Sequence, residues 1–186
     1  MKTLIIGANG ALGKVITPAL YLNHEVITVG RTSGDIILDI AKPESVETLF
    51  EQVGRVDAVI CMAGDSESDT LFAMDTAKFN VGIEQKLFSQ INLVLMGTKY
   101  INDNGSFTLI SGKMGEKPVK GASGKAVANG ALNTFVLAAA LEMPRGIRIN
   151  AVSPSKISNI PSEDLIDAYL KSIEGSVSGQ IIRINY

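Results

Sequence analysis

The sequence predicts an α/β fold in which one doubly wound parallel sheet carries helices on both faces, giving three layers. Short runs rich in β-branched residues alternate with longer helical stretches along the chain, and this alternation is typical of parallel sheets with helical crossovers. The first short run, Thr3–Gly7, is continuously apolar, as expected for a strand that is buried on both faces. A glycine-rich stretch, Gly7–Gly13, joins that run to the first helical stretch.

Strands are expected where short apolar and β-branched runs occur. After Thr3–Gly7, these runs are Glu25–Val29, Asp35–Leu38, Asp57–Cys61, Ser106–Ser111, Ile147–Val152 and Gln180–Ile184. Helices are expected at Ala11–Leu22, Pro43–Val53, Val81–Tyr100, Gly121–Met143 and Ser162–Ile173.

Local signals support these helix assignments. Pro18 lies inside the first helical stretch, where it removes a backbone donor and should bend the helix. Pro43 suits the first turn of the second helix, and Gly54 ends it. The apolar face of that helix consists of Val46, Leu49, Phe50 and Val53. The fourth helical stretch is rich in alanine.

Composition restricts the classes of function. With 46% apolar and 19% charged residues, the chain is expected to form a single globular domain over residues 1–186. The net charge of −2 and the lack of a basic block predict no binding to nucleic acid or to an anionic membrane. No apolar run approaches the ~20 residues of a membrane span, so a cytoplasmic protein is expected. A single Cys61 and a single His24 argue against a disulfide, a metal site and a Ser-His-Asp triad.

The stretch "GANGALG" predicts a phosphate-binding turn. Gly7 permits the tight turn, Gly10 lets a pyrophosphate approach the backbone, and Gly13 lets the helix pack close to the sheet. Free N–H groups at the start of the helix complete an anion site. We assign to cofactor binding the loop residues Gly7, Asn9, Gly10, Ala11, Leu12 and Gly13. The alternative is a glycine turn that binds nothing.

The end of the second strand favours NADP(H) over NAD(H). An acidic residue there accepts the ribose hydroxyls of NAD, but this chain has "VGRTSG". Arg31 offers a fork-shaped cation, and the hydroxyls of Thr32 and Ser33 lie beside it. This set suits the 2′-phosphate of NADP. The alternative is that Arg31 is a solvated loop residue.

Together these stretches resemble the short-chain dehydrogenase/reductase family over essentially the whole chain. "GANGALG" is similar to the glycine motif of that family in its GxxGxxG spacing. "LDI", "CMAG" and "IRINAVSPSKI" resemble its adenine-flanking pair, the turn after its fourth strand, and its sixth strand. The resemblance implies a Rossmann fold and further cofactor contacts by Asp39, Ile40, Ala63, Gly64, Pro154 and Ile157.

The catalytic half of the resemblance is atypical. The family uses a Tyr, followed four residues later by a Lys, and a Ser at the end of the fifth strand. In the matching register this chain has Lys125, Asn129 and Gly112, with Ser111 beside the last, and "INL" supplies the helix Asn as Asn92. The candidate catalytic residues are therefore Lys125, Asn129, Ser111 and Asn92. An ammonium group is itself an acid, so Lys125 could donate the proton directly; the alternative is a solvated helix start with Asn129 as a filler or cap.

Two surface segments have open interpretations. Lys113, Lys117, Lys120 and Lys125 follow the fifth strand, and they either attract an anionic substrate or form a solvated loop. The acidic stretch "DSESD" (Asp65–Asp69) lacks the spacing of a cation site, so we interpret it as a solvated loop.

Two functions of different classes are consistent with the sequence. The first is an NADP(H)-dependent oxidoreductase that acts on a small carbonyl or alcohol with a non-standard proton donor. The second is a catalytically inactive NADP(H)-binding sensor or regulatory protein, which the missing Tyr and Lys favour. The resemblance also implies a homodimer or homotetramer through the helices Val81–Tyr100 and Gly121–Met143. Their small residues would equally suit burial against the sheet.

Overall fold

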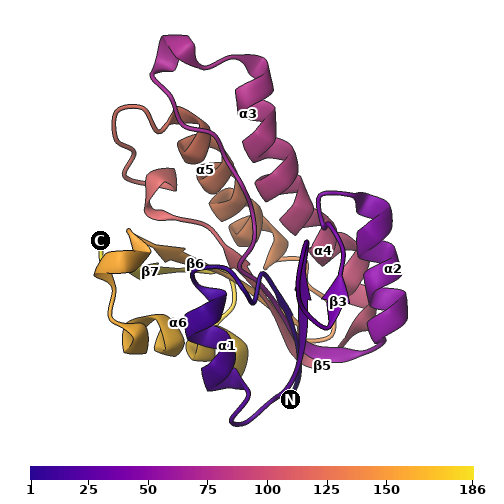
Figure 1. Cartoon of the computed structure of the whole chain (residues 1–186). Coiled ribbons are helices and arrows are strands. Elements are labelled where there is room, and N and C mark those ends of the chain that lie inside the picture. Colours follow the sequence, from indigo (N-terminus) through magenta and orange to yellow (C-terminus); the bar gives the residue numbers. More distant parts are fainter.

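The computed structural model describes all 186 residues and contains one seven-stranded sheet in the order β3-β2-β1-β4-β5-β6-β7 (Figure 1). Its strands are β1 (Lys2–Ile6), β2 (Glu25–Gly30), β3 (Ile36–Ile37), β4 (Val56–Cys61), β5 (Ile101–Ile110), β6 (Arg148–Pro154) and β7 (Gln180–Ile184). Every neighbouring pair is parallel. The strand order reverses between β1 and β4, and in open α/β sheets the ligand crevice lies at that point. The predicted fold class is confirmed.

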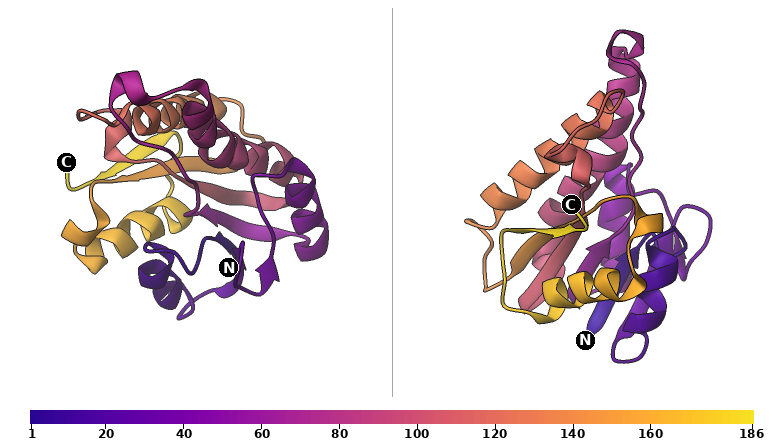
Figure 2. Two further views of the ribbon diagram at one scale, coloured as in Figure 1. Left: turned by 45° about the horizontal axis from the view of Figure 1, so that its top comes forward. Right: turned by 90° about the vertical axis from the view of Figure 1, so that its left-hand side faces the viewer.

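Helices cover both faces of the sheet (Figures 1 and 2). They are α1 (Gly13–Leu20), α2 (Pro43–Val53), α3 (Thr76–Gly82), α4 (Ser89–Gly97), α5 (Ser123–Ala139) and α6 (Ser162–Glu174). A core of 23 buried residues packs α2, α4 and α5 on one face. A core of 15 buried residues packs α1 and α6 on the other. None of these helices combines the length and the apolar character that crossing a bilayer requires.

The third predicted helix differs most from the structure. It begins at Thr76 rather than Val81, because the Asp75 side chain accepts a hydrogen bond of 2.8 Å from the backbone N–H of Lys78 and so caps the first turn. It is also interrupted by a π-helical segment, Ile83–Phe88, between α3 and α4. Such segments are rare and occur frequently at functional sites.

Other boundaries shift by a few residues. Strand β5 begins at Ile101 rather than Ser106, because the register against β4 shifts near Val56 and admits the extra residues. Helices α1 and α5 are shorter than predicted. The predicted bounds of α2 match the structure, and Gly54 ends this helix with a φ of +70°.

Candidate cofactor-binding and active site

The turn after β1 forms a cradle of unpaired backbone N–H groups. Gly7 has a φ of +86°, which favours glycine. A side chain on Gly13 would collide with the carbonyl group of Ala8, so glycine lets α1 start close to the strand. The N–H groups of Ala11, Leu12 and Gly13 donate no hydrogen bond within the protein. Unpaired N–H groups at a helix start bind phosphate.

A cavity of about 660 Å³ opens beside this cradle at the carboxyl ends of β1, β2 and β4. Its lining brings together these predicted cofactor residues: Gly7, Asn9, Gly10, Arg31, Thr32, Asp39, Ile40, Ala63 and Gly64. Five predicted residues lie outside the lining: Ala11, Leu12, Gly13, Pro154 and Ile157. The first three belong to the cradle. Pro154 is the last residue of β6 and Ile157 lies in the turn after it, farther along the same edge of the sheet.

Arg31 is already paired at the mouth of the cavity. Its Nη2 lies 2.9 Å from a carboxylate oxygen of Asp65, and both side chains are more than half exposed. The Asn9 amide donates a hydrogen bond of 2.8 Å to the Ser33 hydroxyl. A phosphate at this position would therefore compete with Asp65 for the guanidinium group.

These features fit a dinucleotide. The cradle offers free N–H donors for a pyrophosphate, and the neighbouring cavity offers a cation, hydroxyl groups and the carboxylate of Asp39 for an adenosine ribose. A buried carboxamide oxygen, Oδ1 of Asn129, has no hydrogen-bond partner in the protein. Buried unpaired polar atoms are uncommon in proteins, but Asn129 does not line the cavity.

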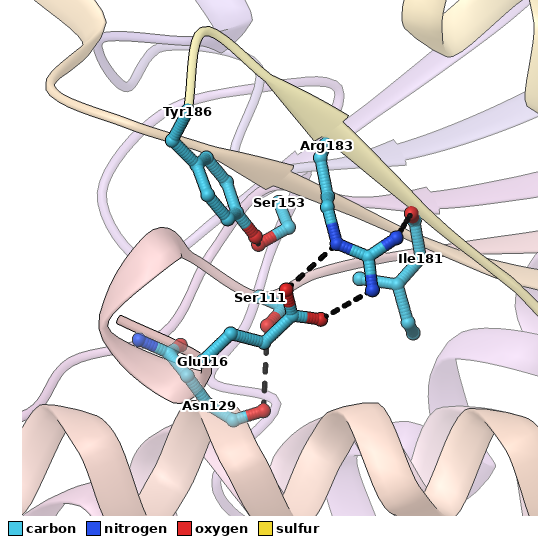
Figure 3. A network of polar contacts seen from close by, with 7 residues as sticks. All are labelled: Ser111, Glu116, Asn129, Ser153, Ile181, Arg183 and Tyr186. Carbon is cyan, nitrogen blue, oxygen red and sulfur yellow. Dashed lines mark hydrogen bonds and ion pairs between the residues drawn. The ribbon is translucent and has the colours of Figure 1, made fainter. Parts of the chain in front are cut away.

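The ends of β5 and α5 bring together Ser111, Gly112 and Asn129. The Ser111 side chain is 4% exposed, and its hydroxyl donates to the backbone carbonyl of Asn129 at 3.3 Å (Figure 3). A side chain on Gly112 would lie 3.1 Å from the Asn129 amide nitrogen. The hydroxyl predicted for the active site is therefore directed at helix α5.

The other two candidate catalytic residues occupy different surroundings. Lys125 is exposed in the first turn of α5, one turn before the buried Asn129. Asn92 is half-buried in the middle of α4 and does not line the cavity. The structure thus groups Lys125, Asn129 and Ser111 near the start of α5 and leaves Asn92 apart.

Lys86 is a candidate residue that sequence reasoning missed. It lies in the π-helical segment, is 8% exposed, and is the only buried side chain that carries a charge. Its Nζ lies 3.4 Å from the backbone carbonyl of Ser111. Burial lowers the pKa of Lys86 to about 8, and the nearby Lys125 acts in the same direction. Perturbed groups of this kind cluster at functional sites.

Tyr186 is also near the site in space but remote from it in sequence. Its hydroxyl lies 2.6 Å from the Ser153 hydroxyl, close to Ser111 (Figure 3). The ring has the amines of Lys113 and Lys117 each 5.7 Å from its centroid. Burial raises the pKa of Tyr186 above its usual range. No local sequence motif predicts this position, because Tyr186 reaches the site only through the pairing of β7 with β6.

The comparison with known families decides the affiliation. The family profile described as "Enoyl-(Acyl carrier protein) reductase" matches residues 22–176. The chain belongs to the short-chain dehydrogenase/reductase family. The crystal structure of the protein lin1944 from Listeria innocua is 41% identical, covers all of both chains and superposes with a TM-score of 0.95.

Curated members of this family are more distant. The 3-oxoacyl-[acyl-carrier-protein] reductase FabG of Escherichia coli is 27% identical over 88% of this chain and 76% of its own. An uncharacterized oxidoreductase of Mycobacterium tuberculosis is 28% identical over 72% of this chain and 54% of its own. The chain spans about half the length of the first curated relatives that it matches.

The acidic "DSESD" stretch of this short-chain dehydrogenase/reductase is a mostly exposed loop, as predicted, and it also makes two surface ion pairs. Two carboxylates of the "DSESD" stretch make ion pairs, Asp65 with Arg31 and Asp69 with Lys78, because the stretch folds back along the cleft and the start of α3. No group of acidic, His or Cys side chains is arranged to hold a metal ion. The His24 ring lies between Thr3 and Glu174 at the opposite, amino end of the strands.

Proposed function

We propose that the protein is an NADP(H)-dependent oxidoreductase that reduces a small carbonyl compound or oxidises the corresponding alcohol. The observation that carries the proposal is the single cavity in which the glycine turn meets Arg31, Thr32 and Ser33. The turn suits a pyrophosphate, and the cation with its hydroxyl groups suits a 2′-phosphate. Membership of an oxidoreductase family supports the reaction class.

The cofactor, when bound, would supply or accept a hydride at its nicotinamide ring. The cradle at Gly7–Gly13 would hold the pyrophosphate, and Asp39 and Ile40 would flank the adenosine. Ala63 and Gly64 line the same cavity and would also contact the cofactor, and Pro154 and Ile157, at the end of β6, would border the nicotinamide half.

Lys125 is the proposed proton donor to the alkoxide that forms during carbonyl reduction. It is an ammonium group at the start of α5, and its exposure leaves it accessible to a substrate. The buried carboxamide of Asn129, with its free oxygen, would orient a ribose hydroxyl. General acid catalysis of this kind contributes about 10²–10⁴-fold to a rate.

Oxidation of NADPH, followed at 340 nm across a panel of aldehydes, ketones and quinones, tests this proposal. Calorimetry with NADPH and NADH on the same preparation measures binding independently of turnover. Turnover with at least one carbonyl class is expected, together with tighter binding of NADPH than of NADH. If neither dinucleotide binds, the proposal is wrong.

A second candidate is an NADP(H)-binding sensor without turnover. The observation that favours it is Asn129, a neutral side chain that cannot lower the pKa of a neighbouring acid by its charge. NADPH binding without hydride transfer to any member of the panel would support the sensor over the enzyme.

Self-association is also proposed, as a homodimer or homotetramer acting in the cytoplasm. Helices α4 and α5, the segment before α4 and the turn after α5 expose large apolar side chains: Phe88, Leu95, Val127, Leu137 and Leu141. A second copy of the chain would cover them. Light scattering coupled to size exclusion tests this, and Leu95→Lys with Leu137→Lys should shift the mass to that of a monomer.

A further inference from the structure

The buried amine of Lys86 has few partners in the protein. Every other lysine is exposed or half-buried, whereas Lys86 is 8% exposed. An ammonium group has three N–H donors, but the structure gives it one hydrogen bond, of 3.4 Å, to the Ser111 carbonyl. Burying a charge without full compensation is costly. Such a group is retained most readily where a ligand uses it.

The backbone around Lys86 makes room for its stem. A side chain on Gly64 would lie 2.9 Å from Cγ of Lys86, and Gly64 itself has a φ of +149°. The π-helical segment Ile83–Phe88 sets the position of this residue between α3 and α4. Two unusual backbone features, a glycine and a π-helical segment, therefore coincide at one side chain.

The amine lies beside the half of the cleft that the adenosine does not use. The cradle follows β1; the cavity with Arg31 extends from it over β2 and β3 and, on the other side of β1, reaches Gly64 after β4. Strand β4 lies on the other side of β1, and β5 follows it. Gly64 follows β4 and Ser111 follows β5, so Lys86 lies at the carboxyl ends of these two strands. A dinucleotide anchored at the cradle must extend its nicotinamide half over this edge.

We infer that Lys86 makes the cleft discriminate between the two oxidation states of the cofactor, favouring the reduced nicotinamide. The oxidised ring carries a positive charge and the reduced ring is neutral, so a buried ammonium group beside the ring repels only the oxidised form. The phosphates are the same in both forms and do not contribute to the difference. This inference rests on the proposed function, and it applies to the enzyme and to the sensor alike.

The discrimination should depend on pH. The titratable groups that act on Lys86 are the Cys61 thiol from β4, Asp65 from the segment after it, and Lys125 from α5. Burial raises the pKa of Cys61 to about 12, so this thiol stays neutral. Since the pKa of Lys86 is about 8, its charge, and with it the repulsion of the oxidised ring, should disappear as the pH rises from 7 to 9.5.

Calorimetric titration with NADP⁺ and NADPH at pH 7 and pH 9.5 tests the inference. For the wild-type chain, the ratio Kd(NADP⁺)/Kd(NADPH) is expected to fall about tenfold between these pH values. Lys86→Met should show the low ratio at both pH values. The exposed Lys120→Met serves as the matched control and should behave as the wild type does.

The outcomes separate this inference from the proposed function. If both dinucleotides bind the wild-type chain with a ratio that changes neither with pH nor in Lys86→Met, the inference is wrong and the proposed function stands. If neither dinucleotide binds, both the inference about Lys86 and the proposed function are wrong. The pH dependence is measured on the wild-type chain alone. The inference can therefore be tested even if Lys86→Met folds poorly.

Discussion

The two ends of the cleft are built in different ways. One end, the proposed phosphate site, consists of one continuous segment of backbone, from Gly7 to Gly13, with free N–H groups. The opposite end is assembled from side chains on separate elements: Ser111 after β5, Lys86 between α3 and α4, Lys125 and Asn129 on α5, and Tyr186 after β7.

This difference affects how each end tolerates change. A backbone cradle keeps its donors whatever the side chains are, provided that glycine stays where the turn needs it. The side-chain end can exchange one donor for another while the fold persists. On our proposal, this explains how the chain keeps a glycine turn like that of its family while Lys125 and Asn129 stand in the register of the usual Tyr and Lys.

Removal of the proposed proton donor should have the largest effect of the changes considered. It should lower the rate of catalysis and leave cofactor binding at the glycine turn unchanged. Lys125→Met is expected to lower kcat at least about 100-fold, because no general acid then reaches the alkoxide. The affinity for NADPH should stay nearly unchanged, since Lys125 lies away from the cradle. Single-turnover kinetics and calorimetry measure the two quantities.

Tyr186→Phe is the matched control for that experiment. The Tyr186 hydroxyl bonds to Ser153 near the same end of the cleft, so it is the competing donor. Activity retained in Tyr186→Phe and lost in Lys125→Met supports Lys125. The reverse pattern would assign the proton to the tyrosine and contradict our proposal.

Lys86 should weaken the fold at the side-chain end. Its pKa is lowered to about 8, so between pH 8 and about 10.5 the folded chain holds fewer protons than the unfolded chain. The free energy of unfolding should therefore rise with pH across this window. Lys86→Met should be more stable than the wild type by about 3 kcal/mol at pH 7. Urea unfolding at pH 7, 8.5 and 10 measures both effects, and a less stable Lys86→Met would show that the amine supports the fold.

The sequence allowed the backbone end to be predicted in detail. Glycine spacing after an apolar strand specifies a local turn, and the structure has it at Gly7–Gly13 with Arg31 in the adjoining cavity. A turn of this kind is determined by residues that are adjacent in the chain, so a local sequence pattern is enough to predict it.

The side-chain end could be predicted only in part. Lys86 was missed because nothing local distinguishes a buried lysine from a solvated one, and its burial follows from the π-helical segment and from Gly64. The structure brings Tyr186 to Ser153 through strand pairing of β6 with β7. Contacts between residues far apart in sequence arise from the fold as a whole.

Selectivity for the cofactor should respond to Arg31 without any change at the other end. Arg31→Gln is expected to weaken NADPH binding about tenfold, a moderate loss because the Arg31 side chain is 61% exposed. NADH binding should be unaffected, because NADH lacks the 2′-phosphate. Arg55→Gln, an exposed arginine before β4, is the control and should change neither affinity. Equal losses for both cofactors would mean that Arg31 supports the cavity wall rather than the phosphate.

Asp65→Asn should change the NADPH affinity least, and in the direction opposite to Arg31→Gln. Its carboxylate holds Arg31 at 2.9 Å in the free protein, so a 2′-phosphate has to displace it. Exposed pairs of this kind are worth about 0 to 1 kcal/mol, and Asp65→Asn should therefore tighten NADPH binding by about two- to fourfold and leave NADH unchanged. Asp69→Asn breaks the comparable pair with Lys78 outside the cavity and should change neither affinity. If Asp65→Asn instead weakened NADPH binding, the carboxylate would be orienting Arg31 for the phosphate, and the cofactor end of the cleft would depend on a side-chain contact after all.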